Sequence, residues 1–180
     1  FGPKNQGLSK EEVEERAREA LTQVGLDEKL WQQSPFELSG GQKRRVAIAG
    51  VMAMHPGVLI LDEPTAGLDP KGRDEILDEI SALHRDRHMT IILVSHSMED
   101  IARYADRIMV MNHGEKVFDA PPKEVFRHYK ELEAIGLAAP QITYIVQGLK
   151  EHGVPIADDI TTVAEAKDAI LQLLGKDERP

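Results

Sequence analysis

The sequence predicts an α/β fold built around parallel strands. Two short apolar runs, residues 58–61 and 90–94, have the composition of β-strands, and apolar residues at helical spacing lie between them. A strand, a helix and a second strand in this order form a unit with parallel strands and a right-handed crossover. Because both runs are continuously apolar, we expect both faces of these strands to be covered.

Helix-start patterns frame the segment before the first strand. Ser9 and Glu12 form a capping box that begins a helix, and Gly25 is placed to end it. Ser39 and Gln42 form a second box, followed by small apolar residues that suit a closely packed helix. This part of the chain is therefore predicted to be mainly helical.

The segment after the second strand is expected to combine a hairpin with further helices. A short helix over residues 98–105 precedes two strand-like runs around Asn112-His113-Gly114, which predict an antiparallel hairpin at the far end of the sheet. Pro121 and Pro122 mark a boundary. Helices are predicted over residues 123–128, over 140–150 and after the capping box Thr162–Glu165. These helices are too few for an independent core, so they should pack on the rest of the chain or on a partner.

Composition excludes several classes of function. The net charge of −9 over 180 residues disfavours nucleic acid as a partner, because phosphate contacts need clustered Lys and Arg. The absence of cysteine excludes disulfides and thiol-rich zinc sites. No apolar run is long enough to cross a bilayer. The chain begins at Phe1 without Met, and we expect it to be a piece of a longer protein.

Ser39-Gly40-Gly41-Gln42 is a candidate anion site. A helix start presents unpaired N–H groups and the positive end of the helix dipole. Two glycines let a phosphate approach the backbone, and the serine hydroxyl adds a hydrogen-bond donor. The alternative is a glycine-rich turn that caps an ordinary helix, and the motif by itself does not separate the two.

Asp62 and Glu63 follow directly on the first apolar strand. Mg²⁺ prefers oxygen ligands and keeps several waters, so a single aspartate at a strand end is a suitable ligand. Glu63 is placed to orient a water that attacks a phosphate. The alternative is a pair of solvated carboxylates. A buried strand immediately upstream favours the functional interpretation, because ligands of α/β sheets bind at the carboxyl ends of strands.

Two further positions gain meaning from Asp62 and Glu63. His96 follows the second apolar strand, and parallel strands would bring it to the same sheet edge. Gly67-Leu68-Asp69-Pro70 is by itself a turn sequence. The other histidines show no metal-ligand spacing.

The order and spacing of these motifs resemble those of the ATP-binding-cassette (ABC) ATPases. The resemblance implies that Ser39, Gly40, Gly41 and Gln42 bind the ATP held by the opposite subunit of a head-to-tail dimer. It implies that Asp62 is the Walker B aspartate, facing Mg²⁺ through water, and that Glu63 is the catalytic glutamate. Asp69 matches the D-loop at the dimer interface, and His96 matches the switch histidine near the γ-phosphate.

Within that family the chain is most similar to the ATPase subunits of energy-coupling factor transporters. The Walker A pattern G-x-x-x-x-G-K-[ST], the adenine-stacking aromatic and the Q-loop glutamine are all absent. The implied fold is therefore a partial P-loop NTPase core with a helical subdomain and a C-terminal helical extension. Residues 1–56 would be the helical subdomain with the signature motif, 57–120 the Walker B part of the core, and 121–180 an extension used in dimerisation.

The resemblance implies a parent protein that hydrolyses ATP, with Mg²⁺, to power import of vitamins or transition-metal ions. Its partners would be a second ATPase subunit, identical or different, a transmembrane coupling subunit and a substrate-binding membrane subunit. It would lie at the cytoplasmic face of the membrane, and this chain alone is expected to be inactive. Two alternatives stay open: a non-catalytic dimerisation or docking module, and a non-transport ABC ATPase, which the acidic charge disfavours.

Overall fold

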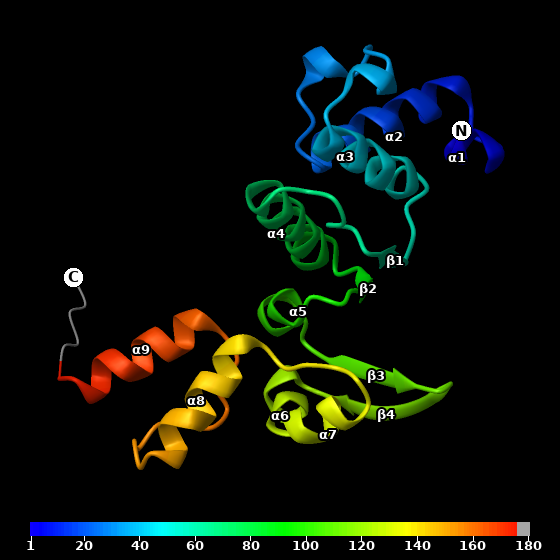
Figure 1. Ribbon diagram of the computed structural model, residues 1–180. Coiled ribbons are helices and arrows are strands. Elements are labelled where there is room, and N and C mark those ends of the chain that lie inside the picture. Colours follow the sequence, from blue (N-terminus) through cyan, green and yellow to red (C-terminus); the bar gives the residue numbers. More distant parts are fainter. Residues whose placement is uncertain (176–180) are drawn as a thin grey trace. The chain divides into compact units, whose positions relative to one another are not determined.

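The computed structural model describes residues 1–175, except for the side chain of Arg87. The chain divides into two compact units, Phe1–Val94 and Ser95–Pro180 (Figure 1). This division falls between the predicted boundaries near residues 56 and 120. The predicted boundaries stay predictions.

The first unit begins with helices whose ends follow the predicted signals. Ser9 Oγ accepts a 3.2 Å hydrogen bond from Glu12 N, which confirms the first capping box, and Gly25 follows the helix with φ of +62°. The second box, at Ser39, is confirmed as well. The first helix and two 3-10 turns were not predicted. These elements are α1 (Gly2–Asn5), α2 (Lys10–Gln23), η1 (Glu28–Leu30), η2 (Pro35–Glu37) and α3 (Gly40–Met52).

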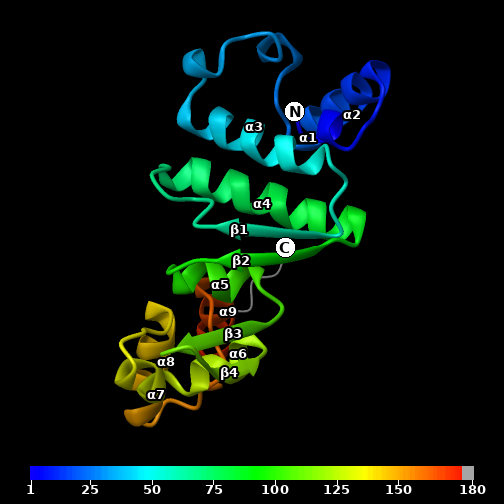
Figure 2. The same cartoon turned by 90° about the vertical axis from the view of Figure 1, so that its right-hand side faces the viewer.

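A strand–helix–strand unit completes the first unit, as predicted. Strands β1 (Val58–Asp62) and β2 (Thr90–Val94) pair in parallel, and α4 (Pro70–Arg87) connects them. Figure 2 shows α4 lying between α3 and the two strands. The predicted apolar stripe of α4 is buried in full: Ile76, Leu77, Ile80 and Leu83 are each no more than 6% exposed.

The expectation that both faces of these strands are covered is wrong for the described residues. Leu59 is 2% exposed, whereas its neighbour Ile60 is 64% exposed. Ile92, which lies opposite Ile60 in the register, is 46% exposed. Successive side chains of a strand point to opposite faces of the sheet. The described part of the chain therefore covers one face and leaves an apolar face open.

The second unit contains the predicted hairpin. Strands β3 (Ile108–Asn112) and β4 (Glu115–Ala120) pair antiparallel after the short helix α5 (Met98–Tyr104). His113 and Gly114 both have positive φ, the conformation that tight two-residue hairpin turns require. The hairpin forms a two-stranded sheet of its own, which corrects its expected place at the far end of a sheet with β1 and β2.

Two apolar clusters hold the C-terminal helices. In the first, Phe126 and Leu132 pack with Ile108 and Val110 of the hairpin, so this part of the extension packs on the rest of the chain, as expected. The second is centred on Val146. Ile145, next to Val146 in α8, is 56% exposed. These helices are α6 (Pro122–Arg127), α7 (Tyr129–Ala134, not predicted), α8 (Gln141–Glu151) and α9 (Val163–Leu173).

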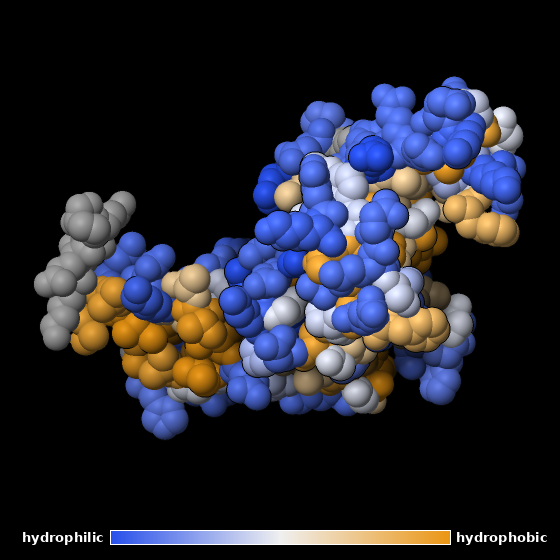
Figure 3. Space-filling model, turned by 90° about the horizontal axis from the view of Figure 1, so that it is seen from above, coloured by the Kyte–Doolittle hydropathy of each residue, from blue (hydrophilic) through white to orange (hydrophobic). Residues whose placement is uncertain are grey.

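Ion pairs add to the contacts of the second cluster. Lys123 of α6 pairs with Glu165 at 2.8 Å, and Lys150 of α8 pairs with Asp158 at 2.8 Å. Apolar side chains remain exposed near the end of α9, including Leu174 at 63%. Figure 3 shows apolar side chains gathered on one face of this part of the chain. Residues 176–180, the end of the predicted extension, lie outside the described residues. Within the described part of the chain, no helix is long and apolar enough to span a membrane.

Candidate functional site

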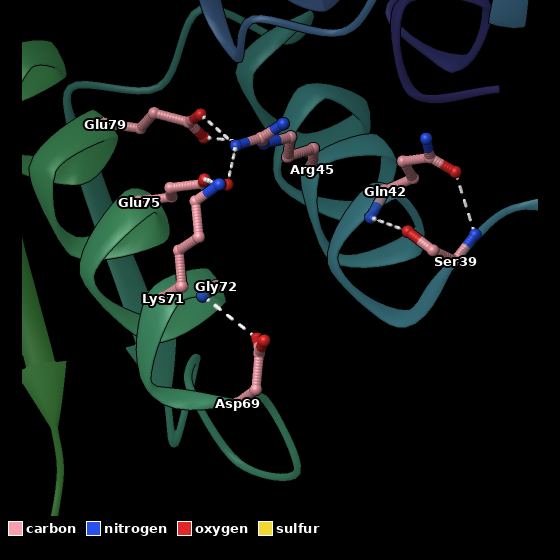
Figure 4. A network of polar contacts seen from close by, with 8 residues as sticks. All are labelled: Ser39, Gln42, Arg45, Asp69, Lys71, Gly72, Glu75 and Glu79. Carbon is pink, nitrogen blue, oxygen red and sulfur yellow. Dashed lines mark hydrogen bonds and ion pairs between the residues drawn. The ribbon is translucent and has the colours of Figure 1, made fainter.

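The start of α3 has the geometry of an anion site. Ser39 Oγ accepts a 3.3 Å hydrogen bond from Gln42 N, and Gln42 Oε1 accepts a 2.8 Å bond from Ser39 N (Figure 4). This reciprocal box occupies the backbone donors of Ser39 and Gln42. The N–H groups of Gly40 and Gly41 lie in the first turn, where no intrahelical acceptor exists. They lie at the positive end of a 13-residue helix, so they favour a negatively charged ligand.

The two glycines are not required by the packing of the chain itself. A Cβ atom at Gly41 would meet nothing within 4 Å, and one at Gly40 would meet only Leu68 Cδ2, at 4.0 Å. Both residues lie within a right-handed helix, where alanine is favoured over glycine. The capping interpretation explains Ser39 and Gln42 but leaves the glycines unexplained. Space for a ligand that approaches the backbone accounts for them.

An open pocket of about 450 Å³ lies where the starts of α3 and α4 meet. Asp69 caps α4 by accepting a 3.0 Å hydrogen bond from Gly72 N at Oδ1 (Figure 4). Two helix N-termini with their capping side chains therefore face one space. The structure thus brings Asp69 to the same pocket as the signature residues. The lining residues are Ser39, Gly40, Gly41, Gln42, Arg45, Gly67, Leu68, Asp69, Lys71, Gly72, Glu75 and Ile76.

Asp62 and Glu63 lie at the carboxyl end of β1, as predicted. Asp62 is the last residue of the strand, is exposed, and lies opposite Val94 in the register. Glu63 has φ of +45°, in the left-handed region that few non-glycine residues adopt. Such strain persists only where the surroundings fix it, and it concentrates at functional sites. No sequence pattern predicted this conformation.

The donors at this strand end fit a metal ion that takes most of its ligands from elsewhere. Within residues 1–175, no group of three or more acidic or histidine side chains could enclose a metal. A single exposed carboxylate, that of Asp62, suits Mg²⁺, which is usually held by one or two carboxylates together with phosphates and water. Neither Asp62 nor Glu63 lines the pocket at Ser39. The signature residues and the strand-end carboxylates are therefore not parts of one pocket in this chain.

His96 follows the last residue of β2 by two positions and is exposed. It belongs to the second unit, whereas Asp62 and Glu63 belong to the first. Its predicted approach to the two carboxylates therefore stays a prediction.

A group of charged side chains at the pocket was missed by the sequence interpretation. Arg45 of α3 contacts two glutamates of α4: its Nη2 lies 2.7 Å from Glu79 Oε1 and 3.1 Å from Glu75 Oε2. Burial raises the pKa of Glu79, and the Arg45 guanidinium opposes that rise. The i, i+4 spacing of Glu75 and Glu79 places both on one helix face. This spacing in the sequence could have indicated that the two carboxylates share one cationic partner.

Comparison with known proteins agrees with these features. A protein-family model described as ABC transporter matches residues 3–66. The chain is 60% identical over 176 residues to the energy-coupling factor transporter ATP-binding protein EcfA2 of Clostridium tetani, covering 97% of this chain and 61% of that protein. The chain thus spans about three fifths of the length of the curated relatives it matches.

Solved structures agree as well. The cbiO1 protein of Clostridium perfringens, part of the ABC transporter complex cbiONQ, is 39% identical with a TM-score of 0.66, over 82% of this chain and 58% of that one. The dimeric ATP-binding cassette MJ0796, in a post-hydrolysis state bound to ADP and Pi, is 34% identical with a TM-score of 0.54. That match covers 64% of this chain and 49% of the cassette. Together these likenesses confirm the resemblance inferred from the motifs.

Proposed function

This chain belongs to the ABC transporter family of ATPases, and we propose that it is the C-terminal portion of the ATP-hydrolysing subunit of an energy-coupling factor importer. Its relative EcfA2 is named as the ATP-binding protein of such a transporter. The imported substrate would be a vitamin or a transition-metal ion. The subunit would work at the cytoplasmic face of the membrane, beside a transmembrane coupling subunit and a substrate-binding membrane subunit.

The proposed site is shared between two ATPase subunits. Ser39, Gly40 and Gly41 of one subunit bind the γ-phosphate of the ATP held by the other, because a helix start offers donors to an anion. Asp62 and Glu63 act at the nucleotide bound by their own subunit. Asp62 faces Mg²⁺ through water, and Glu63 orients the attacking water and accepts its proton. Asp69 lies at the subunit interface, and His96 lies near the γ-phosphate.

One observation carries the shared arrangement. The pocket at Ser39 excludes Asp62 and Glu63, although all three residues belong to the same compact unit. A chain that used them on one nucleotide would have to bring them to one pocket. Two copies arranged head to tail bring the two groups of residues to one nucleotide. In that arrangement the start of α3 of each copy contacts the nucleotide bound by the other copy. The dimeric state of the MJ0796 cassette supports this arrangement.

Subunit mixing tests the proposal in the full-length parent that carries this segment. One subunit carries Ser39→Arg, which places a bulky side chain where phosphate meets the helix start. The other carries a substitution of the Walker A lysine. Pairs of either mutant with itself should be inactive, whereas the mixed pair rebuilds one intact site and should recover part of the wild-type ATPase rate.

Ser9→Arg provides a matched control. Ser9 caps α2 with the same reciprocal box that Ser39 forms on α3, so both changes remove the same kind of cap. The cost in stability should be similar, about 1 kcal/mol, while ATPase activity should fall only with Ser39→Arg. A verified mixed pair that is inactive, although a wild-type subunit paired with the Walker A mutant is active, would contradict the shared site. Equal losses of ATPase activity from the two serine changes would favour the capping interpretation of Ser39.

A further inference from the structure

We infer that Arg45 is a positioning residue: through Glu75 and Glu79 it holds the start of α3 beside the start of α4. Ser39-Gly40-Gly41 and Asp69 are thereby presented to the partner subunit as one rigid surface. The inference rests on the proposed function, since it concerns the geometry of the residues that one subunit contributes to the nucleotide site of the other.

The contacts of Arg45 form a fork between two helices. Its Nε donates to Glu79 Oε2 at 3.1 Å, and its Nη2 lies 2.7 Å from Glu79 Oε1, so one carboxylate takes two bonds (Figure 4). The same Nη2 donates to Glu75 Oε2 at 3.1 Å. Lys71 lies 3.7 Å from the other oxygen of Glu75. A planar guanidinium bound in this way fixes direction as well as distance, which a lysine would not do.

Burial distinguishes this group from ordinary surface pairs. The side chains of Arg45 and Glu79 are 20% and 24% exposed, whereas those of the pair Lys10–Glu14 on α2 are 84% and 59% exposed. Burying charges costs solvation free energy that their attraction repays only in part. An apolar contact between α3 and α4 would stabilise the fold as well, so stability alone does not account for Arg45. The need for a fixed spacing and orientation of α3 and α4 accounts for Arg45.

The ion pairs of Arg45 with Glu75 and Glu79 lie close to the pocket along both helices. Arg45 lies six residues after the cap Ser39, and Glu75 lies six residues after the cap Asp69, about 9 Å along each helix axis. Both side chains also line the pocket into which the two helix starts open. A change in the spacing or rotation of the two helices at this level would move Ser39 relative to Asp69.

The neighbouring Arg44 makes a second link of the same kind. Its Nη2 donates a 3.3 Å hydrogen bond to the carbonyl of Ala66, in the turn that leads from Glu63 to Asp69. Arg44 thus ties α3 to the loop before α4, and Arg45 ties α3 to α4 itself. The second link is the stronger candidate, because its carboxylate partners are charged.

Mixed pairs of the full-length parent separate positioning from general damage to the fold. In arrangement one, Arg45→Ala is placed on the subunit with the intact Walker A loop, and its partner carries the Walker A lysine mutation. In arrangement two, both changes lie on one subunit and its partner is wild type. Only in arrangement two does the one working site use the altered α3 start. In arrangement two we expect kcat to fall between about tenfold and a hundredfold, with little change in KM. In arrangement one we expect the same kcat and KM as in the reference pair, in which a wild-type subunit is combined with the Walker A mutant.

Controls make the outcome decisive. Lys10→Ala removes an exposed ion pair of the same unit and should leave both arrangements unchanged. If Arg45→Ala does not fold, Glu79→Gln keeps the size of the partner and gives the same comparison. Equal activity in the two arrangements, or equal loss in both, would overturn the positioning role while leaving the proposed function in place. An inactive reference pair without Arg45→Ala would overturn the proposed function and this inference with it.

Discussion

The backbone N–H of Glu63 donates a 2.9 Å hydrogen bond to the carbonyl oxygen of Val94. The β1–β2 ladder therefore extends one residue past the end of β1, and the left-handed turn at Glu63 is held by the sheet. A second bond, from Ala66 N to Glu63 O at 3.1 Å, closes the turn that follows. The backbone of Glu63 is thus held on one side by the strand pair and on the other by the turn that follows.

Glu63→Gln in the full-length parent should leave the fold and ATP binding intact and reduce turnover by a factor on the order of hundreds. Glutamine keeps the size of the side chain and the backbone bond to Val94, but it cannot accept the proton of the attacking water. Steady-state phosphate release and size-exclusion chromatography with ATP should show slow turnover and an accumulated ATP-bound dimer. Glu11→Gln, on the exposed first turn of α2, serves as the control. A variant with near-normal hydrolysis would remove Glu63 from the catalytic role.

Gly41→Ala should stabilise this chain and inactivate the parent. No atom lies within 4 Å of the added methyl group, and alanine is favoured over glycine in a helix by about 0.5–1 kcal/mol. The methyl group would instead occupy the space proposed for the phosphate. Gly50→Ala is a matched control on the same helix, where an added Cβ also meets nothing within 4 Å. Urea unfolding should show a similar gain for both variants, and ATPase assays should show a loss for Gly41→Ala alone. Normal activity of Gly41→Ala would favour the capping interpretation.

Asp119 should make the second unit sensitive to acid. Hydrogen bonds from Arg107 and then Lys116, at 2.5 Å and 2.8 Å, lower the pKa of Asp119 from 3.8 to about 2. A carboxyl whose pKa is lower in the folded state stabilises the fold above its unfolded pKa, and that contribution is lost as the pH falls toward 2. The difference in free energy of unfolding between wild type and Asp119→Asn should therefore be constant above about pH 5 and shrink between pH 4 and pH 2.

Arg107→Gln gives an independent check of the Asp119 assignment. Removing the first donor should raise the pKa of Asp119 toward its unfolded value. Less stability should then be lost in acid than in wild type, and the loss should be complete at a higher pH. Urea unfolding at several pH values measures both variants. A difference between wild type and Asp119→Asn that stays constant down to pH 2 would contradict the assignment.

The open face of the β1–β2 pair should make this chain self-associate. Exposed apolar patches of this kind bind other apolar surfaces, and Ile60 and Ile92 lie side by side on it. Ile60→Thr should reduce binding of an apolar dye and lower the sedimentation-average mass, with little loss of stability. Leu59→Thr, one residue away on the buried face, should cost about 2–4 kcal/mol. Equal destabilisation by the two changes would mean that Ile60 is covered.

Local signals in the sequence were enough to predict most elements. Each capping box, at Ser9, Ser39 and Thr162, begins a helix at the expected residue, because a cap needs only a side chain and the backbone three positions away. The parallel strands and the hairpin turn follow from short runs of residue types. The family resemblance likewise rests on motifs of fewer than ten residues, read in order along the chain.

Tertiary structure decided what depends on contacts between distant residues. Arg45 meets Glu75 and Glu79 only because α3 and α4 pack together, and nothing near Arg45 in the sequence indicates this. Glu63 takes its left-handed conformation because the carbonyl of Val94, 31 residues later, accepts its N–H. The open face at Ile60 was missed because an apolar run shows that a strand prefers burial, whereas its burial depends on which other segments reach that face.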